Sequence, residues 1–252
     1  MMYHARIEAT KGAAPKIAPL RNVTALKRLI TELQERDAGL PGMAVFYGPS
    51  GYGKSTAMTW CANNANAYHV QCLSVWRTRA FCEAILREMS IPPGRTVAHM
   101  VDQIAQEIRA TARPLIVDEA DYLVRLSMIE VLRDIYERSG GAIILIGEEA
   151  LPTKLMQWER VHGRIFAWVR ALVCDLEDCK ELGPLYGQGM PIAEDVYPIV
   201  LEATGGSVRR IAVEFAKLAR HAKLHQLTQI TAQTCSEIEF STGLPPRPRK
   251  SA

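Results

Sequence analysis

The chain has 252 residues, of which 48% are hydrophobic and 23% are charged. These fractions are typical of an ordinary globular protein, and we expect no long disordered region. The formal net charge is only +3, which excludes a protein that binds nucleic acid through its overall charge, so any such binding has to come from local basic patches.

Six cysteines are spread along the chain without a C-x-x-C pair, and most of them lie among apolar residues. This pattern is typical of reduced thiols in a core and argues against a zinc site. Residues 1–19 have no apolar core of a signal peptide, and no later run approaches the length of a membrane span. We therefore expect a cytoplasmic protein with no membrane partner.

Residues 1–21 mix lysines, a glycine and two prolines, and they predict an extended N-terminal arm. From Val23 to Leu33 apolar residues recur at helical spacing, which predicts a helix. The apolar run 43–47 then predicts a buried strand, and it leads directly into a glycine-rich loop.

That loop has the spacing G-x-x-x-x-G-K-S of a phosphate-binding loop. Glycines let backbone N–H groups wrap a polyphosphate, and the helix predicted over 54–64 directs its positive end at the charge. Lys54 is expected to reach the β- and γ-phosphates of ATP, and the Ser55 hydroxyl to coordinate Mg²⁺. The residues expected to bind the nucleotide here are Gly48, Pro49, Ser50, Gly51, Tyr52, Gly53, Lys54, Ser55 and Thr56.

Residues 68–73 predict a second strand, and a cluster of Trp76, Arg77 and Arg79 follows it. Cations can contact phosphates and an aromatic ring can stack on bases, so this cluster is the most DNA-like stretch of the chain. The alternative is a core tryptophan beside two solvated arginines. Two amphipathic helical patterns come next.

The apolar run that ends in Asp118 and Glu119 predicts a buried parallel strand whose carboxyl end presents two carboxylates to the phosphate loop. Asp118 is expected to hold Mg²⁺, and Glu119 to polarise an attacking water. The alternative is an acidic pair that caps a helix. Because a strand intervenes between this one and the phosphate loop, the pattern favours hydrolysis of ATP to ADP and phosphate over a small-molecule kinase.

A helical pattern over 121–139 ends at a Gly-Gly pair, and residues 142–147 predict a buried strand. In ATPases of this layout a polar residue at the end of that strand senses the γ-phosphate. Glu148 has that position, and a solvated turn is the alternative.

The apolar run 171–176 predicts a fifth strand. An arginine just before the last strand can stabilise charge on the ATP of a neighbouring subunit. Arg164 is the first candidate for this finger role and Arg160 the second; a surface arginine on a helix is the alternative.

Only helical patterns follow, and they predict a small helical lid domain over 177–240 after a nucleotide-binding domain over 22–176. Arg209 lies in the first turn of the longest of these helices and is expected to reach the nucleotide. Residues 241–252 form a basic, proline-rich tail.

Together these motifs resemble those of the AAA+ ATPases. The resemblance rests on the phosphate loop, the pair Asp118 and Glu119, an arginine before the last strand, and the G-x-x-R turn that ends at Arg209. It covers residues 22–240 and implies an α/β fold with a five-stranded parallel P-loop sheet flanked by helices and followed by an all-helical lid. It also implies that Arg209 is the sensor-2 arginine and that Arg164 is the finger.

Within that superfamily, the strand end I-L-I-G-E and the turn G-G-S-V-R-R-I-A are similar to the B-protein family of Mu-like transposing phages and to Tn7-type target-selection ATPases. The resemblance implies ATP-dependent helical filaments on double-stranded DNA, selection of target sites and activation of a transposase. It implies that Arg77 and Arg79 face the DNA, and that a phage-encoded chain works in the host cytoplasm.

Mu-type B proteins carry a helical DNA-binding appendage at the N-terminus, whereas a short arm precedes the core here, so we expect DNA contact from the core alone. A helicase-loader or replication-initiator ATPase would share these motifs and is the first alternative function. A signalling ATPase that switches protein interactions without nucleic acid is the second.

Overall fold

The computed structural model describes residues 20–240, and these form two compact units, over 20–173 and over 174–240. Helix α1 already begins at Arg21, because Leu20 and Val23 are buried and anchor its start. The other residues of the predicted arm, 1–19, and the predicted basic tail, 241–252, lie outside the described part of the chain.

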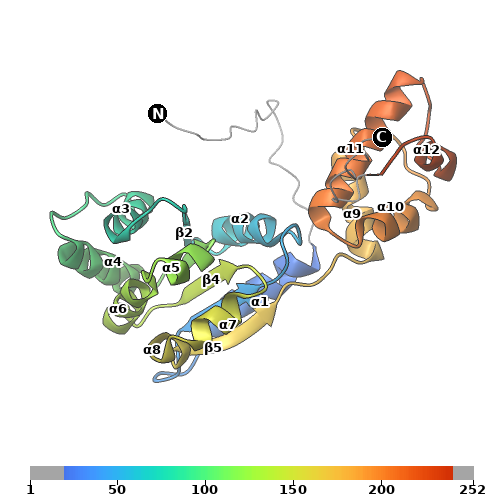
Figure 1. The fold of residues 1–252 in the computed structure, drawn as a ribbon. Helices are drawn as coiled ribbons and strands as arrows, with labels where there is room; N and C mark the ends of the chain where they lie inside the picture. Colours follow the sequence, from blue (N-terminus) through green and yellow to red (C-terminus); the bar gives the residue numbers. More distant parts are fainter. Residues whose placement is uncertain (1–19, 241–252) are drawn as a thin grey trace, which may run out of the picture. The chain divides into compact units, whose positions relative to one another are not determined.

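The first unit is built on a five-stranded parallel sheet with the strand order β2-β3-β4-β1-β5. This confirms the predicted fold class. Since all strands run in one direction, the loops that follow β1, β3 and β4 meet at one edge of the sheet (Figure 1). The strands are β1 (Met43–Tyr47), β2 (Tyr68–Gln71), β3 (Leu115–Asp118), β4 (Ile143–Gly147) and β5 (Ile165–Arg170).

Helices cover both faces of this sheet. On one face α1 buries an apolar stripe at helical spacing, Leu26, Leu29, Ile30 and Leu33, and packs beside α2. The helices of the first unit are α1 (Arg21–Gln34), α2 (Lys54–Asn64), α3 (Thr78–Glu88), α4 (Val97–Thr111), α5 (Asp121–Arg125), α6 (Ile129–Ser139), α7 (Leu151–Met156) and α8 (Glu159–His162).

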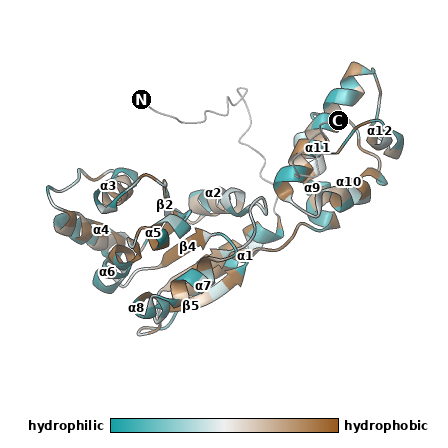
Figure 2. Ribbon diagram, viewed as in Figure 1, coloured by the Kyte–Doolittle hydropathy of each residue, from teal (hydrophilic) through white to brown (hydrophobic). Residues whose placement is uncertain are grey.

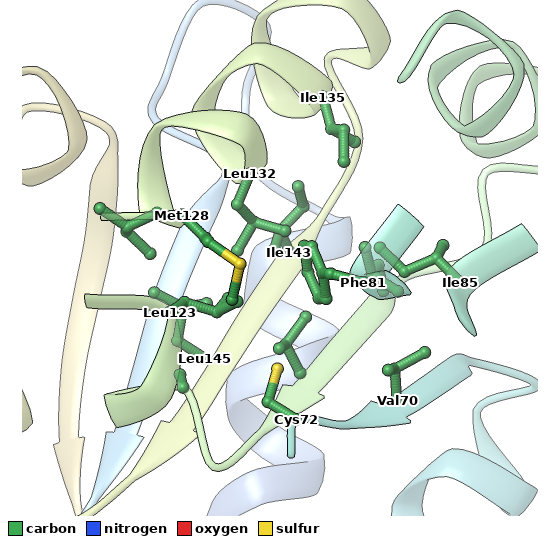
Figure 3. Packing of buried hydrophobic residues seen from close by; sticks show 14 of the residues in the cluster. Val70, Cys72, Phe81, Ile85, Leu123, Met128, Leu132, Ile135, Ile143 and Leu145 are labelled. Atoms are coloured by element: carbon green, nitrogen blue, oxygen red, sulfur yellow. The ribbon is translucent and has the colours of Figure 1, made fainter. Parts of the chain in front are cut away.

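The main hydrophobic core lies against the other face of the sheet. Alternate residues of the strands point to this face, and Figure 2 shows the hydrophobic colouring that β4 carries as a central strand. In Figure 3 side chains from strands and helices point toward one another there: Val70, Cys72, Phe81, Ile85, Leu123, Met128, Leu132, Ile135, Ile143 and Leu145. Burying each large aliphatic side chain stabilises the fold by about 1.5–3 kcal/mol, so this core holds the strand ends in place.

The prediction of a fifth strand over 171–176 is wrong, because β5 runs from Ile165 to Arg170. β5 is an edge strand whose side chains are only half-buried, although its sequence I-F-A-W-V-R is as apolar as that of the central strands. The apolar run that suggested the strand instead leads out of the first unit, and Leu172 and Val173 in it are 44% and 46% exposed.

The helix predicted over 121–139 is also interrupted. Residues after α5 leave the helical path, and Ser127 has a φ of 56°, in the left-handed region. The Met128 N–H then returns to the Leu123 carbonyl at 2.8 Å, and α6 starts at Ile129. No glycine or proline lies at this break, so the helical spacing of the apolar residues predicted one continuous helix.

The second unit consists of helices around a core of its own. Phe215 in its longest helix is fully buried and makes an edge-to-face contact with Tyr197. The helices are α9 (Leu176–Tyr186), α10 (Val196–Thr204), α11 (Val208–Leu224) and α12 (Ala232–Ser236). Among residues 20–240, no helix combines the length and apolar character needed to cross a membrane.

All six cysteines are buried free thiols. Burial is the main cause that raises the pKa of both Cys72 and Cys179 to about 12. A thiol in such surroundings is a poor nucleophile and a poor metal ligand, so these residues serve as small apolar core groups.

Candidate functional site

The loop between β1 and α2 forms a backbone cradle. Gly51 and Gly53 have φ angles of 86° and 79°, which strain any residue with a side chain. Gly53 is also the N-cap residue of α2, so the helix begins at Lys54 and its free N–H groups lie beside the loop. At Gly48 an added Cβ would lie 3.0 Å from the Ala171 Cβ, which explains glycine at the start of the loop.

The Lys54 side chain lies over this cradle. Its Nζ donates to the carbonyls of Gly48 at 2.7 Å and Pro49 at 2.9 Å. Burial lowers the pKa of Lys54, and four neighbouring carboxylates oppose that shift. In order of effect they belong to Asp118, Glu119, Glu148 and Asp121. The loop therefore has one partly desolvated cation on its phosphate side and an acidic cluster next to it.

Ser55 and Asp118 come together from two different elements. The Ser55 hydroxyl at the start of α2 donates to Asp118 Oδ2, 3.1 Å away, at the end of β3. Asp118 is 3% exposed, and its other oxygen accepts the Glu119 N–H at 2.8 Å. A hydroxyl and a carboxylate are oxygen ligands of the kind that Mg²⁺ prefers when phosphate oxygens and water complete its shell. These two residues fit a magnesium ion.

Glu119 is held in an unusual backbone conformation directly after β3. Its φ is 55°, which is rare for a residue with a side chain and costs about 1–2 kcal/mol. The next N–H, that of Ala120, is fixed by the Ile146 carbonyl at 2.9 Å. Burial, followed by the charge of Asp118, raises the pKa of the Glu119 carboxyl. A raised pKa suits a group that takes a proton from water.

Asp121 is a site residue that the sequence reasoning missed. It is 8% exposed, its Oδ2 accepts the Glu148 N–H at 2.7 Å, and its Oδ1 pairs with Lys154 Nζ at 2.6 Å. An added Cβ on Gly147 would lie only 2.4 Å from Oδ2, so the glycine makes room for this contact. Asp121 thus ties the end of β4 to the end of β3. The sequence signal that could have indicated Asp121 is its position three residues after Asp118, at the end of β3.

We expect Asp121→Asn to destabilise the protein by about 1–3 kcal/mol, because the amide has one acceptor oxygen for two donors and loses the charge that pairs with Lys154. Urea unfolding measures this change. The matched control is Glu149→Gln, whose ion pair with Arg170 is more than half exposed on both sides and should contribute less than about 1 kcal/mol. Equal losses for the two variants would show that the contacts of Asp121 contribute no more stability than an exposed ion pair.

Glu148 is exposed at the end of β4. A pocket of about 460 Å³ opens beside it, and Glu119 lines the same pocket. Two cations also line this pocket, Arg125 on α5 and Lys154 on α7. Since a carboxylate repels phosphate, these cations are chemically better suited than Glu148 to face a γ-phosphate. The sensing role stays a prediction for Glu148.

Arg164 lies at the end of the sheet where the strands begin, whereas the phosphate loop lies at the opposite end, where they finish. Its carbonyl accepts the N–H of Met43 at 3.0 Å, at the start of β1, whereas the loop follows the end of that strand. A five-residue strand is about 16 Å long, so Arg164 is remote from the loop of its own subunit. Its guanidinium pairs with Glu137, and both side chains are about two-fifths exposed. Arg160 is exposed on α8 and forms no salt bridge within residues 20–240.

Arg209 belongs to the second unit, as the second residue of α11. The turn before it uses Gly205 and Gly206 with φ angles of 58° and 69°, which explains the two glycines. The approach of Arg209 to the nucleotide stays a prediction.

Trp76 is half-buried and packs against the core of the first unit, which agrees with the alternative of a core tryptophan. Arg77 is exposed at the N-cap of α3 and donates to the Trp76 carbonyl at 3.1 Å. Arg79 is about half exposed, pairs with Glu83 at 2.8 Å and donates to the Arg95 carbonyl at 2.9 Å. Both arginines are thus on the surface beside a tryptophan that is only half-buried, and their contact with DNA stays a prediction.

Comparison with known proteins relates the chain to AAA domains and to a transposition protein. An AAA domain family matches residues 36–155. The Mu-like prophage FluMu DNA transposition protein B of Haemophilus influenzae is 31% identical over 144 residues. The match covers 55% of this chain and 49% of that protein, so the chain spans about half the length of this relative.

Solved structures share the fold at low sequence identity. The Aeropyrum pernix ORC2 protein in its ADP form superimposes with a TM-score of 0.64 at 16% identity, over 85% of this chain and 66% of that one. The ORC1 protein of the same organism, in complex with DNA, gives 0.61 at 14% identity, over 86% and 64%. These likenesses show that the chain shares the fold of these structures.

Proposed function

We propose that this chain, an AAA+ protein that resembles the B transposition protein of a Mu-like prophage, is an ATPase that assembles on double-stranded DNA and activates or directs a transposase. The observation that carries the proposal is the 31% identity to a DNA transposition protein, and the contact of Ser55 with Asp118 beside the phosphate loop supports it.

The nucleotide part of the proposal rests on the geometry at the sheet edge. The cradle over Gly48 to Ser55 holds the polyphosphate of ATP, with Lys54 on its outer phosphates. Ser55 and Asp118 would hold Mg²⁺, which would neutralise charge on the phosphates. Glu119, with its raised pKa, orients the attacking water and accepts its proton. The products are ADP and phosphate.

The assembly part rests on the distance between Arg164 and the phosphate loop of its own subunit. An arginine at the far edge can serve an ATP only in a neighbouring copy, so ATP joins subunits head to tail. Weak basic contacts are then repeated along a duplex, so the assembled protein binds DNA tightly although the net charge of each chain is only +3. Arg209 of the second unit completes the nucleotide contacts in this proposal.

Arg77→Ala together with Arg79→Ala should weaken binding of the ATP-bound protein to duplex DNA and lower the salt slope of log K by about 1 per lost phosphate contact and subunit. Fluorescence anisotropy over a salt series measures this slope. The matched control removes two exposed cations of α1, with Lys27→Ala and Arg28→Ala, and should leave the slope unchanged. Equal salt slopes for the two double variants would show that Arg77 and Arg79 do not contact the DNA.

The likeness to ORC proteins favours a replication-initiator or helicase-loader ATPase as the second candidate function. A strand-transfer assay with and without the cognate transposase separates the two. We expect ATP and the protein to stimulate strand transfer into the DNA that carries the filament. Stimulation of helicase loading without any effect on strand transfer would favour the second candidate.

A further inference from the structure

Asn22, near the start of α1, is a buried polar residue whose hydrogen bonds reach two distant parts of the first unit. It is 5% exposed. Its Nδ2 donates to the carbonyl of Tyr52 at 2.8 Å and to that of Leu172 at 2.9 Å. Its Oδ1 accepts the Leu172 N–H at 2.8 Å. One amide group therefore binds three backbone groups of two residues that lie outside the strands and helices.

The two partners have different roles. Tyr52 lies inside the phosphate loop, between the two glycines with positive φ. Leu172 lies two residues before Cys174, where the second unit begins. Neighbouring contacts join the same segments: Arg21 donates to the Val173 carbonyl, and Ala171 lies against Gly48. The start of α1 thus fastens the exit segment 171–173 to the phosphate loop.

We propose that Asn22 is a positioning residue that couples nucleotide binding in the phosphate loop to the order of the exit segment 171–173. The inference deepens the proposed function and depends only on its nucleotide-binding part. A polyphosphate fixes the peptide groups of the loop, including the Tyr52 carbonyl. Because the same NH₂ group binds Tyr52 and Leu172, ordering the first partner restricts the second. The coupling is reciprocal, so loosening the exit segment weakens nucleotide binding by the same factor.

Hydrogen exchange of the Leu172 amide tests the coupling, with and without Mg²⁺ and a non-hydrolysable ATP analogue. In the parent protein we expect the analogue to slow this exchange at least about threefold. In Asn22→Leu, which has a similar volume and no polar atoms, we expect the analogue to bind about tenfold more weakly. At saturating analogue, exchange at Leu172 in this variant should no longer respond to the nucleotide.

Asn22→Asp is the second variant, because it keeps the size and the acceptor but places a carboxylate against two carbonyls. It should also lose the response at Leu172. The matched control is Thr24→Ala, an exposed position on the same helix, which should keep both the affinity and the response.

A nucleotide response at Leu172 that survives in Asn22→Leu overturns the proposal, even when the variant has a lower melting temperature, since it makes Asn22 a structural residue only. Parent protein that binds the analogue without any change at Leu172 also overturns it, while leaving the proposed ATPase intact. Parent protein that binds no nucleotide removes the proposed function and the coupling together.

Discussion

Glu119→Gln should lower the rate of ATP hydrolysis at least about 100-fold and leave ATP binding unchanged, because the amide keeps the size of the side chain but cannot accept a proton from water. Lys54 and the pair of Ser55 and Asp118, which hold the phosphates and Mg²⁺ in the proposed site, are not altered. Single-turnover hydrolysis and equilibrium binding of a fluorescent ATP analogue measure the two effects separately.

The same substitution should trap the protein on DNA. If ATP joins neighbouring subunits and hydrolysis releases them, assemblies of the variant should dissociate from duplex at least ten times more slowly than those of the parent. Filter binding after a competitor chase measures dissociation, and electron micrographs show whether filaments persist. Glu149→Gln, an exposed carboxylate at the end of the neighbouring strand, is the control. Equal dissociation rates for Glu119→Gln and the parent would exclude release of the assembly by ATP hydrolysis.

The raised pKa of Glu119 also gives hydrolysis a pH dependence with a defined sign. The carboxylate accepts a proton only when it is ionised, so the rate falls as the pH drops through its pKa in the folded protein. Because burial and neighbouring carboxylates raise that pKa, the loss begins at a higher pH than for an exposed glutamate. The remaining rate of Glu119→Gln should lack this dependence.

Sequence reasoning located what is encoded locally. The phosphate loop depends on glycines at two positive-φ positions and on a lysine and a serine beside them, all within eight residues. The central strands were predictable because both of their faces are buried and their residues are almost all apolar. The pair Asp118 and Glu119 follows from its position at the end of one of these strands.

Features that depend on tertiary contacts were not predictable in the same way. Asn22 and Leu172 are 150 residues apart, and an asparagine in a helix pattern carries no sign of such a partner. Asp121 was assigned only to a helix, because its contact with the Glu148 N–H requires the register of β3 beside β4. Strand β5 was misplaced because two apolar runs, 165–169 and 171–174, follow each other closely, and only the pairing with β1 shows which of them joins the sheet.

Loss of the finger arginine should be the largest single effect outside the phosphate loop. Where an arginine finger has been measured it contributes about 10³–10⁵-fold to the hydrolysis rate. Arg164→Ala should therefore abolish DNA-stimulated hydrolysis while leaving ATP binding by the monomer intact, since the residue is remote from the loop of its own subunit. Lys54→Ala should abolish hydrolysis through loss of phosphate binding. The same measurement on Arg160→Ala decides between the two arginines.

Mixing the inactive variants tests whether the arginine acts on a neighbour. In an equal mixture of Lys54→Ala and Arg164→Ala, about a quarter of head-to-tail interfaces join an intact loop to an intact arginine, so hydrolysis should recover to about that fraction of the parent rate. An arginine that acts within its own subunit gives no recovery at any ratio. Recovery with Arg160→Ala in place of Arg164→Ala would move the finger to α8, where the side chain is exposed and no salt bridge within residues 20–240 has to break before it reaches a partner. The exposed pair of Arg164 with Glu137 is weak enough to break for the same purpose.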